Sequence, residues 1–168
     1  MHRYSEVETR IGRFRVACGP KGITTISLVD GSPTQFELAY RMRFGVLPEY
    51  REIPERFRRA VMNAAAGKAY TPVPIDLSGL SDFQLKVLKA LQRVPRGEVQ
   101  TYAWLAQKAG RPGAARAVGN IMARNPVPLL IPCHRVVPAS GGIGNYGLGK
   151  ARKRDLLQCE GATGIRME

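Results

Sequence analysis

Hydrophobic and polar residues alternate along two neighbouring stretches near the amino terminus, residues 9–17 and 23–29. The turn sequence Gly-Pro-Lys-Gly at residues 19–22 separates them, and Asp-Gly-Ser-Pro at residues 30–33 follows the second stretch. Alternation with a period of two is typical of strands with one buried face, and glycine and proline favour tight turns. These residues therefore predict a β-hairpin.

Residues 54–66 carry a helical pattern instead. Phe57 and Val61 lie four positions apart, Pro54 suits the first turn of a helix, and Gly67 favours its end. The proline-rich residues 72–76 are unsuited to a central strand and predict an edge strand or a linker. We expect an N-terminal α/β domain whose sheet contains the hairpin, over residues 1–78, with the boundary near residues 77–80.

The second half of the chain, residues 79–168, is expected to form a mostly helical domain within an overall α/β (α+β) fold. Ser81 and Gln84 have the spacing of a capping box, in which each side chain bonds the backbone N–H of the other residue. A helix with one apolar face follows and ends before Pro95 and Gly97.

Two further short helices predict a helix-turn-helix. Thr101 can cap a helix over residues 102–109, and Pro112 can begin another that runs to about residue 124. The second of these begins with small residues around Arg116. Small residues allow a close approach to a groove floor and leave one long probe, but they also suit packing against the preceding helix. Composition leaves both interpretations open.

The net charge of the chain is more informative about its partners than its length. The chain has 168 residues, with 26 Lys and Arg against 13 Asp and Glu, for a formal net charge of +13. Residues 81–168 hold 14 basic and 5 acidic residues, so most of the excess lies there. Such a charge favours an anionic partner, either nucleic acid, an acidic membrane surface or a phosphorylated ligand, although a solvated basic surface explains it equally well.

The sequence offers no membrane or secretory signature. No apolar run approaches the roughly 18 residues of a membrane span. Residues 1–15 contain charges of both signs and no apolar core of a signal peptide. We therefore expect no membrane association and a cytoplasmic location, close to the nucleoid if the source is prokaryotic.

The three cysteines are sparse and odd in number: Cys18, Cys133 and Cys159. They argue against a disulfide framework and for a reducing compartment, and no metal-ligand spacing occurs. We therefore expect neither a metal nor a cofactor. Cys18 and Cys159 are interpreted as structural thiols.

Cys133 is followed directly by His134 and Arg135. A cysteine acts as a nucleophile only as the thiolate, which requires a base or a positive neighbour. His2, the only other histidine, falls in an expected flexible tail, so His134 is the available imidazole base. A thiol protease would need a distant histidine, which excludes that class. A buried structural cysteine remains the alternative.

Several spaced motifs in one register resemble the O6-alkylguanine-DNA alkyltransferases. They are Ala-Ala-Arg-Ala-Val-Gly at 114–119, Asn-Pro-Val-Pro at 125–128, Pro-Cys-His-Arg-Val at 132–136, Gly-Asn-Tyr-Gly at 144–147, Lys153, Leu-Leu at 156–157 and Glu-Gly at 160–161. The resemblance covers residues 81–162 without gaps, about half the chain.

The resemblance implies direct DNA repair in which an alkyl group moves once and irreversibly from guanine O6 to Cys133. His134 would act as base through a bridging water, Glu160 would complete the relay and Asn125 would brace the turn. O4 of thymine is a second candidate target, and the implied partner is double-stranded DNA carrying alkylated guanine, bound by a monomer. The base would be flipped out of the stack from the minor groove.

The remaining implied roles concern the substrate. Tyr102 would donate a proton or hydrogen bond to guanine N3, Lys153 would assist the site, and Arg116 would fill the gap left by the extruded nucleotide. The base pocket is assigned to Val136, Tyr146 and Gly147, with backbone at Val136 and Cys133 accepting from the guanine amino group. The predicted DNA-contacting residues are Arg116, Ala114, Ala115, Arg124 and Arg135.

Departures from the family pattern limit the comparison. Leu148 stands where the family most often has glycine, which puts the tolerated alkyl group in doubt. The chain lacks the cysteine-rich extension of the bifunctional regulators and the cysteine and histidine cluster of zinc-binding relatives. Two hypotheses of other classes stay open: a lesion sensor that binds without transfer, which Cys133 argues against, and a sequence-specific helix-turn-helix transcription factor.

Overall fold

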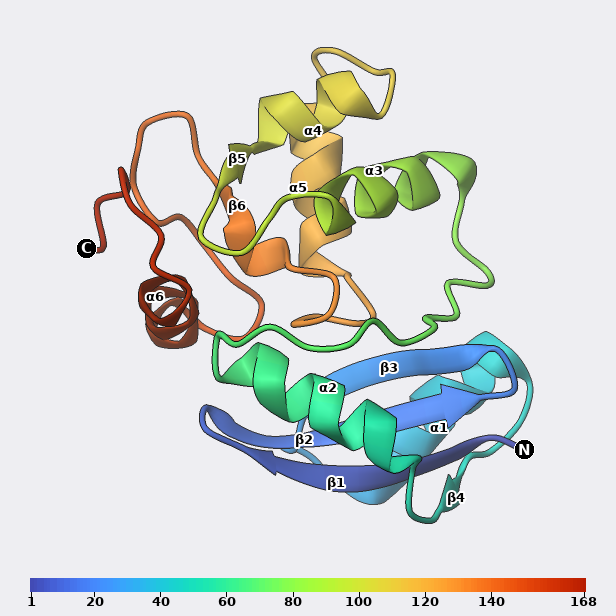
Figure 1. The fold of residues 1–168 in the computed structure, drawn as a ribbon. Coiled ribbons are helices and arrows are strands. Elements are labelled where there is room, and N and C mark those ends of the chain that lie inside the picture. Colours follow the sequence, from blue (N-terminus) through green and yellow to red (C-terminus); the bar gives the residue numbers. More distant parts are fainter.

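The computed structural model describes residues 1–168 and confirms the α/β fold class. Strands and two helices form the N-terminal half, and helices dominate the C-terminal half (Figure 1). No helix is long and apolar enough to cross a membrane. The elements of the first half, in chain order, are β1 Arg3–Thr9, β2 Gly12–Gly19, β3 Gly22–Leu28, α1 Pro33–Phe44, β4 Glu49–Tyr50 and α2 Glu55–Ala65.

The second half is built from short elements. They are α3 Asp82–Gln92, β5 Gln100–Thr101, α4 Tyr102–Lys108, α5 Ala115–Ala123, a 3-10 turn η1 Cys133–Arg135, β6 Val136–Val137 and α6 Lys150–Cys159. The capping box forms at Ser81 and Gln84, and the Thr101 side chain caps α4, as the local sequence predicts. Helices α4 and α5 pack together as the expected helix-turn-helix.

The N-terminal sheet has the strand order β3-β2-β1-β4. The predicted hairpin is confirmed as β2–β3, but the first strand begins at Gly12 and not at residue 9. Strand β1, which the sequence analysis missed, pairs antiparallel with β2 along its whole length. Charged residues interrupt its alternation, since Arg3, Glu6 and Glu8 are half-buried or exposed while Tyr4, Ser5 and Val7 are buried.

Three further features differ from the sequence prediction. Helix α1 was not predicted, and α5 begins at Ala115, since residues 112–113 form a turn. His2 is not in a free tail, because its ring bonds the Tyr40 hydroxyl at 2.8 Å. Residues 72–76 agree with the predicted edge strand or linker, because they form no regular strand but bridge the edge of β3, where Pro74 O accepts from Ile23 N. This contact requires glycine at Gly22, where a Cβ would lie 2.3 Å from Pro74 O.

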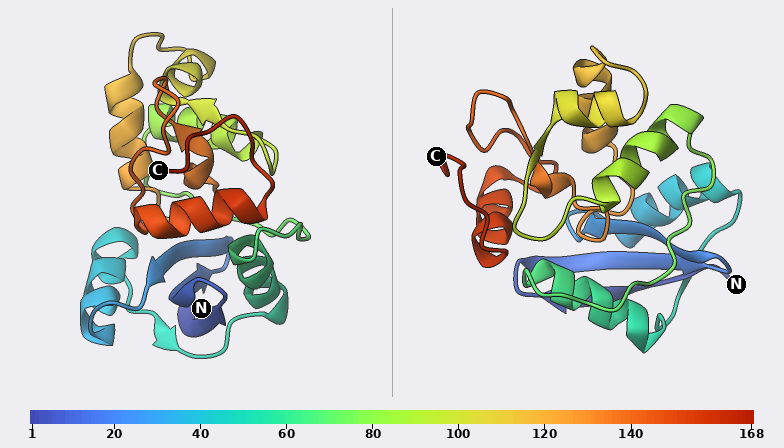
Figure 2. Two further views of the ribbon diagram at one scale, coloured as in Figure 1. Left: turned by 90° about the vertical axis from the view of Figure 1, so that its left-hand side faces the viewer. Right: turned by 45° about the horizontal axis from the view of Figure 1, so that its top comes forward.

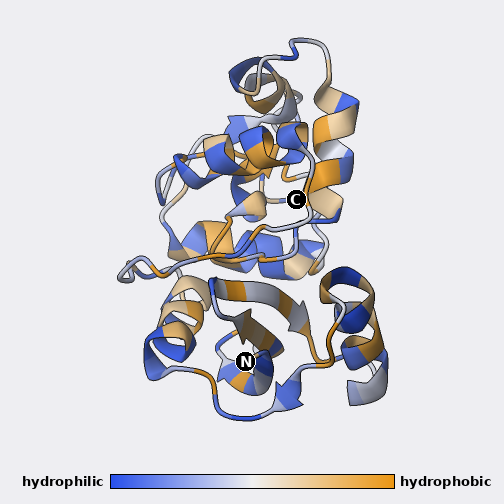
Figure 3. Cartoon of the chain, turned by 90° about the vertical axis from the view of Figure 1, so that its right-hand side faces the viewer, coloured by the Kyte–Doolittle hydropathy of each residue, from blue (hydrophilic) through white to orange (hydrophobic).

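The two halves share one hydrophobic core. A cluster of 30 buried residues runs from the sheet and α2 into α3, α4, α5 and α6. Strands, helices and the loop before Cys133 all contribute to it, and the helices carry both hydrophilic and hydrophobic residues (Figure 3). Because this core is continuous, the N-terminal sheet supports the segments that carry the cysteine.

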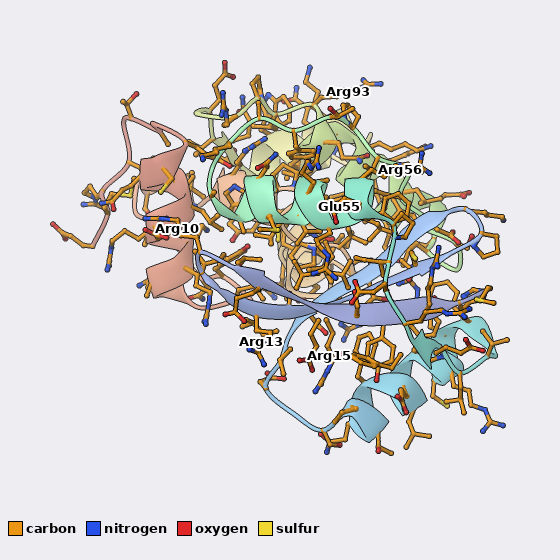
Figure 4. All side chains as sticks on the ribbon, turned by 60° about the horizontal axis from the view of Figure 1, so that its bottom comes forward. Arg10, Arg13, Arg15, Glu55, Arg56 and Arg93 are labelled. Carbon is orange, nitrogen blue, oxygen red and sulfur yellow. The ribbon has the colours of Figure 1, made fainter.

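Helix α6 lies at the boundary between the halves, beside the end of the sheet where β1 turns into β2 (Figures 1 and 2). Arg10, beside α6 in Figure 4, pairs with Asp155 of that helix at 2.6 Å. Arg152 donates to Ile11 O at 2.7 Å. These contacts fix α6, whose last turn leads into Glu160.

Candidate active site

Cys133 opens the 3-10 turn η1 at the floor of a 260 Å³ pocket. The residue is 7% exposed, and the apolar run of residues 127–131 that precedes it is buried. Helix α4, helix α5 and the loop before α6 supply the walls: Tyr102, Gly119, Met122, Ala123, Asn145, Tyr146 and Gly147. The structure thus brings Cys133, Tyr102, Tyr146 and Gly147 together.

Asn125 holds the chain that leads to Cys133. Its Nδ2 donates to Ile131 O at 2.8 Å, and its Oδ1 accepts from Val127 N at 3.1 Å. Between them, Leu129 has φ of 75°, the one non-glycine residue with a positive φ. This conformation costs energy for a side chain with a Cβ, so the turn depends on surrounding contacts such as those of Asn125.

Glu160 meets His134 although the two lie 26 residues apart. The His134 Nε2 to Glu160 Oε1 distance is 2.8 Å, and their side chains are 1% and 2% exposed. Arg135 donates to both oxygens of the same carboxylate, from Nε at 3.0 Å and from Nη2 at 2.9 Å. A forked pair of this kind fixes the carboxylate in one orientation.

These contacts decide the protonation of the pair. Burial alone would raise the pKa of Glu160, but the hydrogen bonds from His134 and Arg135 outweigh it and lower that pKa to about 2. Burial lowers the pKa of His134. An ionised carboxylate only accepts, so a neutral His134 must carry its proton on Nε2 and its lone pair on Nδ1. Nδ1 is buried and has no hydrogen-bond partner within the protein.

Cys133 is a thiol at rest. Burial raises its pKa, while a hydrogen bond from Asn125 and the positive charge of Lys153 act in the opposite direction without cancelling it. A nucleophilic role for this sulfur therefore requires a base at the moment of reaction. The neighbouring His134 carries an imidazole nitrogen, Nδ1, that has no hydrogen-bond partner within the protein.

Lys153 is fully buried and ties two segments of the site together. Its Nζ donates to Val136 O at 2.6 Å and to Asn145 O at 3.0 Å. Burial lowers the pKa of Lys153 to about 8, and the nearby Cys133 counteracts that shift. The ammonium therefore braces the loop that carries Tyr146 against the strand that follows Cys133. It also occupies one of the two lone pairs on the Val136 carbonyl.

Both tyrosines of the pocket keep their protons at neutral pH, because burial raises the pKa of Tyr102 and of Tyr146. The Tyr146 hydroxyl is buried without a hydrogen-bond partner in the protein. Each phenol can therefore serve as a hydrogen-bond donor to a bound group.

The residues expected to touch DNA separate into two groups. Arg116 is exposed in the first turn of α5, with Ala114 and Ala115 half-buried beside it, and Arg124 is exposed just beyond the helix. Arg135 differs, because its guanidinium is 13% exposed and donates to Glu160 and to Val94 O. Its placement argues against the predicted DNA contact and makes Arg135 a positioning residue.

The sequence analysis missed part of the pocket wall. Gly119, Met122 and Ala123 follow an i, i+3, i+4 spacing on one face of α5, a signal that could have found them. A second hollow of 220 Å³ adjoins the first and shares Cys133 and Tyr146 with it. Its other wall comes from the N-terminal strand β3, at Ser27 and Leu28, and from Leu148. No local pattern reveals that contact.

No group of three or more histidine, cysteine, aspartate or glutamate side chains is placed to bind a metal ion.

The sequence and the fold were compared with those of known proteins. Residues 82–162 match the family described as "6-O-methylguanine DNA methyltransferase, DNA binding domain". The chain is 41% identical over 154 residues to the methylated-DNA–protein-cysteine methyltransferase of Mycobacterium leprae, covering 92% of this chain and 89% of that one. A crystal structure of Mycobacterium tuberculosis OGT in complex with DNA is 32% identical, with a TM-score of 0.78, and the match covers 98% of this chain and 95% of that one.

Proposed function

Because the chain belongs to the methylated-DNA–protein-cysteine methyltransferase family and is a DNA-repair alkyltransferase, we propose that Cys133 accepts the alkyl group in a single irreversible turnover. The substrate proposed is O6-alkylguanine in duplex DNA. The observation that carries the assignment is the position of Cys133 in the lining of the pocket, next to a histidine whose Nε2 contacts a buried carboxylate and whose Nδ1 is free.

Deprotonation comes first. His134 Nδ1 takes the thiol proton, directly or through one water, and Glu160 stabilises the imidazolium that forms. Arg135 keeps the carboxylate ionised and aligned with Nε2. Lys153, whose positive charge acts on Cys133, stabilises the thiolate.

Transfer follows by displacement at the alkyl carbon. A sulfur–carbon bond forms as the carbon–O6 bond breaks, and the electron pair remains with the guanine. Tyr102 gives its proton to guanine N3 as the base leaves. The proton that His134 took from the thiol then neutralises the Tyr102 phenolate, so the net transfer is one proton from sulfur to guanine. The thioether has no leaving group comparable to guanine, so the protein is consumed in one turnover.

The target carbon is inaccessible inside a base stack, so the proposal includes extrusion of the nucleotide from the minor groove. Flipping costs a few kcal/mol, and less for a poorly paired base. The small residues at the start of α5 allow that helix to approach the groove floor closely. The exposed Arg116 side chain would then occupy the gap that the nucleotide leaves.

The assay maps the adduct. The protein is incubated with a duplex that carries O6-methylguanine, and peptides are analysed by mass spectrometry for a mass increase of one methyl group on Cys133. Cys159→Ser removes an exposed thiol outside the pocket and should leave the adduct unchanged, whereas Cys133→Ser should abolish it. A methyl group on any other residue, or lesion binding with no transfer by the wild type, would refute the proposal. A parallel duplex with O4-methylthymine measures the second candidate target.

We also propose that residues 1–78 form a supporting domain and that the protein acts as a monomer. Strand β3 bonds the turn that precedes Cys133, from Ile26 N to Pro126 O at 2.9 Å. All proposed catalytic side chains come from one chain. The continuous core predicts that both halves unfold together, in one transition seen equally by circular dichroism and by Trp104 fluorescence. Analytical ultracentrifugation measures the molar mass in solution, which should equal that of one chain.

A further inference from the structure

A hollow of 440 Å³ lies between α3 and α4 and is larger than the active-site pocket. We call it the α3–α4 hollow, and it is lined by Lys86, Lys89, Ala90, Arg93, Trp104 and Lys108. It shares no lining residue with the pocket that holds Cys133. Four of its six residues are basic and none is acidic.

Helix α3 and its C-cap residue, Arg93, present three basic side chains as one stripe. Lys86, Lys89 and Arg93 follow the i, i+3, i+7 spacing, and all are exposed. At about 100° per residue, this stripe lies on nearly the opposite side of the helix from the buried Val87, Leu88 and Leu91. Figure 4 shows Arg93 at the periphery of the molecule.

Helix α4 completes the hollow with Trp104 and Lys108, one turn apart. The Lys108 ammonium lies 5.5 Å from the centre of the indole ring. Tyr102 lies two residues before Trp104, which places it about 160° around the same helix. The α3–α4 hollow therefore faces away from the pocket to which Tyr102 contributes, as the arrangement of α3, α4 and α5 in Figure 1 allows the reader to follow.

The charges of the hollow are unsatisfied by the protein. None of its four basic side chains belongs to any of the salt bridges of the structure, which involve other residues. The Trp104 indole N–H forms no hydrogen bond within the protein and is not sealed from solvent. An ordinary basic surface that is only solvated is neither concave nor arranged around an aromatic N–H donor. The concave shape and the Trp104 indole therefore distinguish the hollow from such a surface.

The spacing of the cations suits a phosphodiester backbone. From Lys86 to Arg93 the rise along α3 is about 10 Å, and one DNA strand presents a phosphate about every 3.4 Å along the duplex axis. The stripe can therefore meet about three phosphates of one strand. Trp104 is half-buried against the core and the Lys108 ammonium lies over its ring, so the hollow offers charge and an N–H donor in place of a stacking platform for an unpaired base. This favours duplex DNA over a single strand.

We propose that the α3–α4 hollow binds the phosphate backbone of a second duplex DNA segment while α5 engages the first. The protein would then bridge two segments and pass between them without release into solution. The proposal rests on DNA binding by this chain and not on the role of Cys133. It is therefore tested in the Cys133→Ser background, where no transfer can occur.

The test is capture of a second duplex. Cys133→Ser protein is bound to an immobilised undamaged duplex, washed, and challenged with a fluorescent undamaged duplex. Retention is expected, and adding K86Q, K89Q and R93Q should reduce it at least tenfold. The matched control carries K21Q, R41Q and K68Q, which remove the same charge from exposed positions outside the hollow. It should retain the second duplex as well as the parent. Thermal unfolding verifies that both triple variants fold.

Trp104 fluorescence independently reports whether the second duplex binds at the hollow, because Trp104 is the only tryptophan in the chain. Its emission should change as the second duplex binds, not as the first binds, and the log–log salt slope of that step should fall by about 2 to 3 in the hollow variant. If the two triple variants lost retention of the second duplex equally, net charge alone would explain the effect and the proposal would be overturned. Preference for a single-stranded oligonucleotide, or retention of acidic lipid vesicles in place of duplex, would also overturn it.

Discussion

Replacing Glu160 by glutamine should lower the free energy of unfolding by roughly 3 kcal/mol at pH 7. Glutamine keeps the shape of the side chain but removes the charge that His134 and Arg135 contact. The pKa of Glu160 falls from its ordinary value of 4.5 to about 2 in the folded protein. Each pH unit of difference corresponds to about 1.4 kcal/mol. Because the side chain is 2% exposed, solvent screening reduces this figure little.

The same shift fixes the pH dependence. A folded-state pKa below the unfolded one means that the unfolded chain binds the proton more tightly as acid is added. The contribution of Glu160 is therefore complete above pH 4.5 and is lost as the pH falls toward 2. About 2 kcal/mol of it should disappear between pH 6 and pH 3.

Urea unfolding at several pH values between 7 and 3 measures both effects. The wild type should exceed Glu160→Gln by roughly 3 kcal/mol at pH 7 and by about 1 kcal/mol at pH 3. Glu98→Gln is the control, since Glu98 is exposed and its curve should run parallel to that of the wild type. A gap between wild type and Glu160→Gln that stays constant across this range would refute the reasoning, because the carboxylate would then not be held ionised by its partners.

Four other outcomes are expected. Arg116→Ala should slow repair of duplex far more than reaction with free alkylated guanine, because only the duplex requires extrusion; equal losses in single-turnover rates would exclude the wedge role. Lys153→Met should cost about 2 kcal/mol in urea unfolding and slow transfer, because the carbonyls of Val136 and Asn145 lose their donor. Leu148→Gly should raise the transfer rate of bulky alkyl groups relative to methyl, since Leu148 lines the hollow beside Cys133; unchanged ratios would contradict this. Binding of undamaged duplex should weaken with salt at a log–log slope of about −0.9 per phosphate contact, and a flat response would refute the charge argument.

Local chemistry explains where the sequence predicted the fold well. The capping box at Ser81 and the Thr101 cap involve residues three apart, so their hydrogen bonds form without any tertiary partner. The hairpin of β2 and β3 depends on a four-residue turn for the same reason. Helix α1 was missed because Tyr40 is its only buried residue, so it carries no apolar stripe.

The candidate site shows the same division. The run around Cys133 and the spaced motifs predicted the candidate thiol, its neighbouring histidine and the small-residue helix. They gave no hint that Arg135 contacts Glu160, because the direction of a side chain depends on what packs around it.

By itself, the sequence indicated the class of chemistry through the spaced motifs that resemble the alkyltransferase family, since the adjacent Cys133 and His134 alone left a structural cysteine open. Only the tertiary structure decided which residues contact one another at the candidate site. It brought Glu160 to His134 across 26 residues, set Ile26 against Pro126, and joined α3 to α4 around a basic hollow. The physical reason is burial together with the contacts that oppose it. Burial lowers the pKa of His134 and raises the pKa of the Cys133 thiol, whereas the hydrogen bonds from His134 and Arg135 keep the buried Glu160 carboxylate ionised.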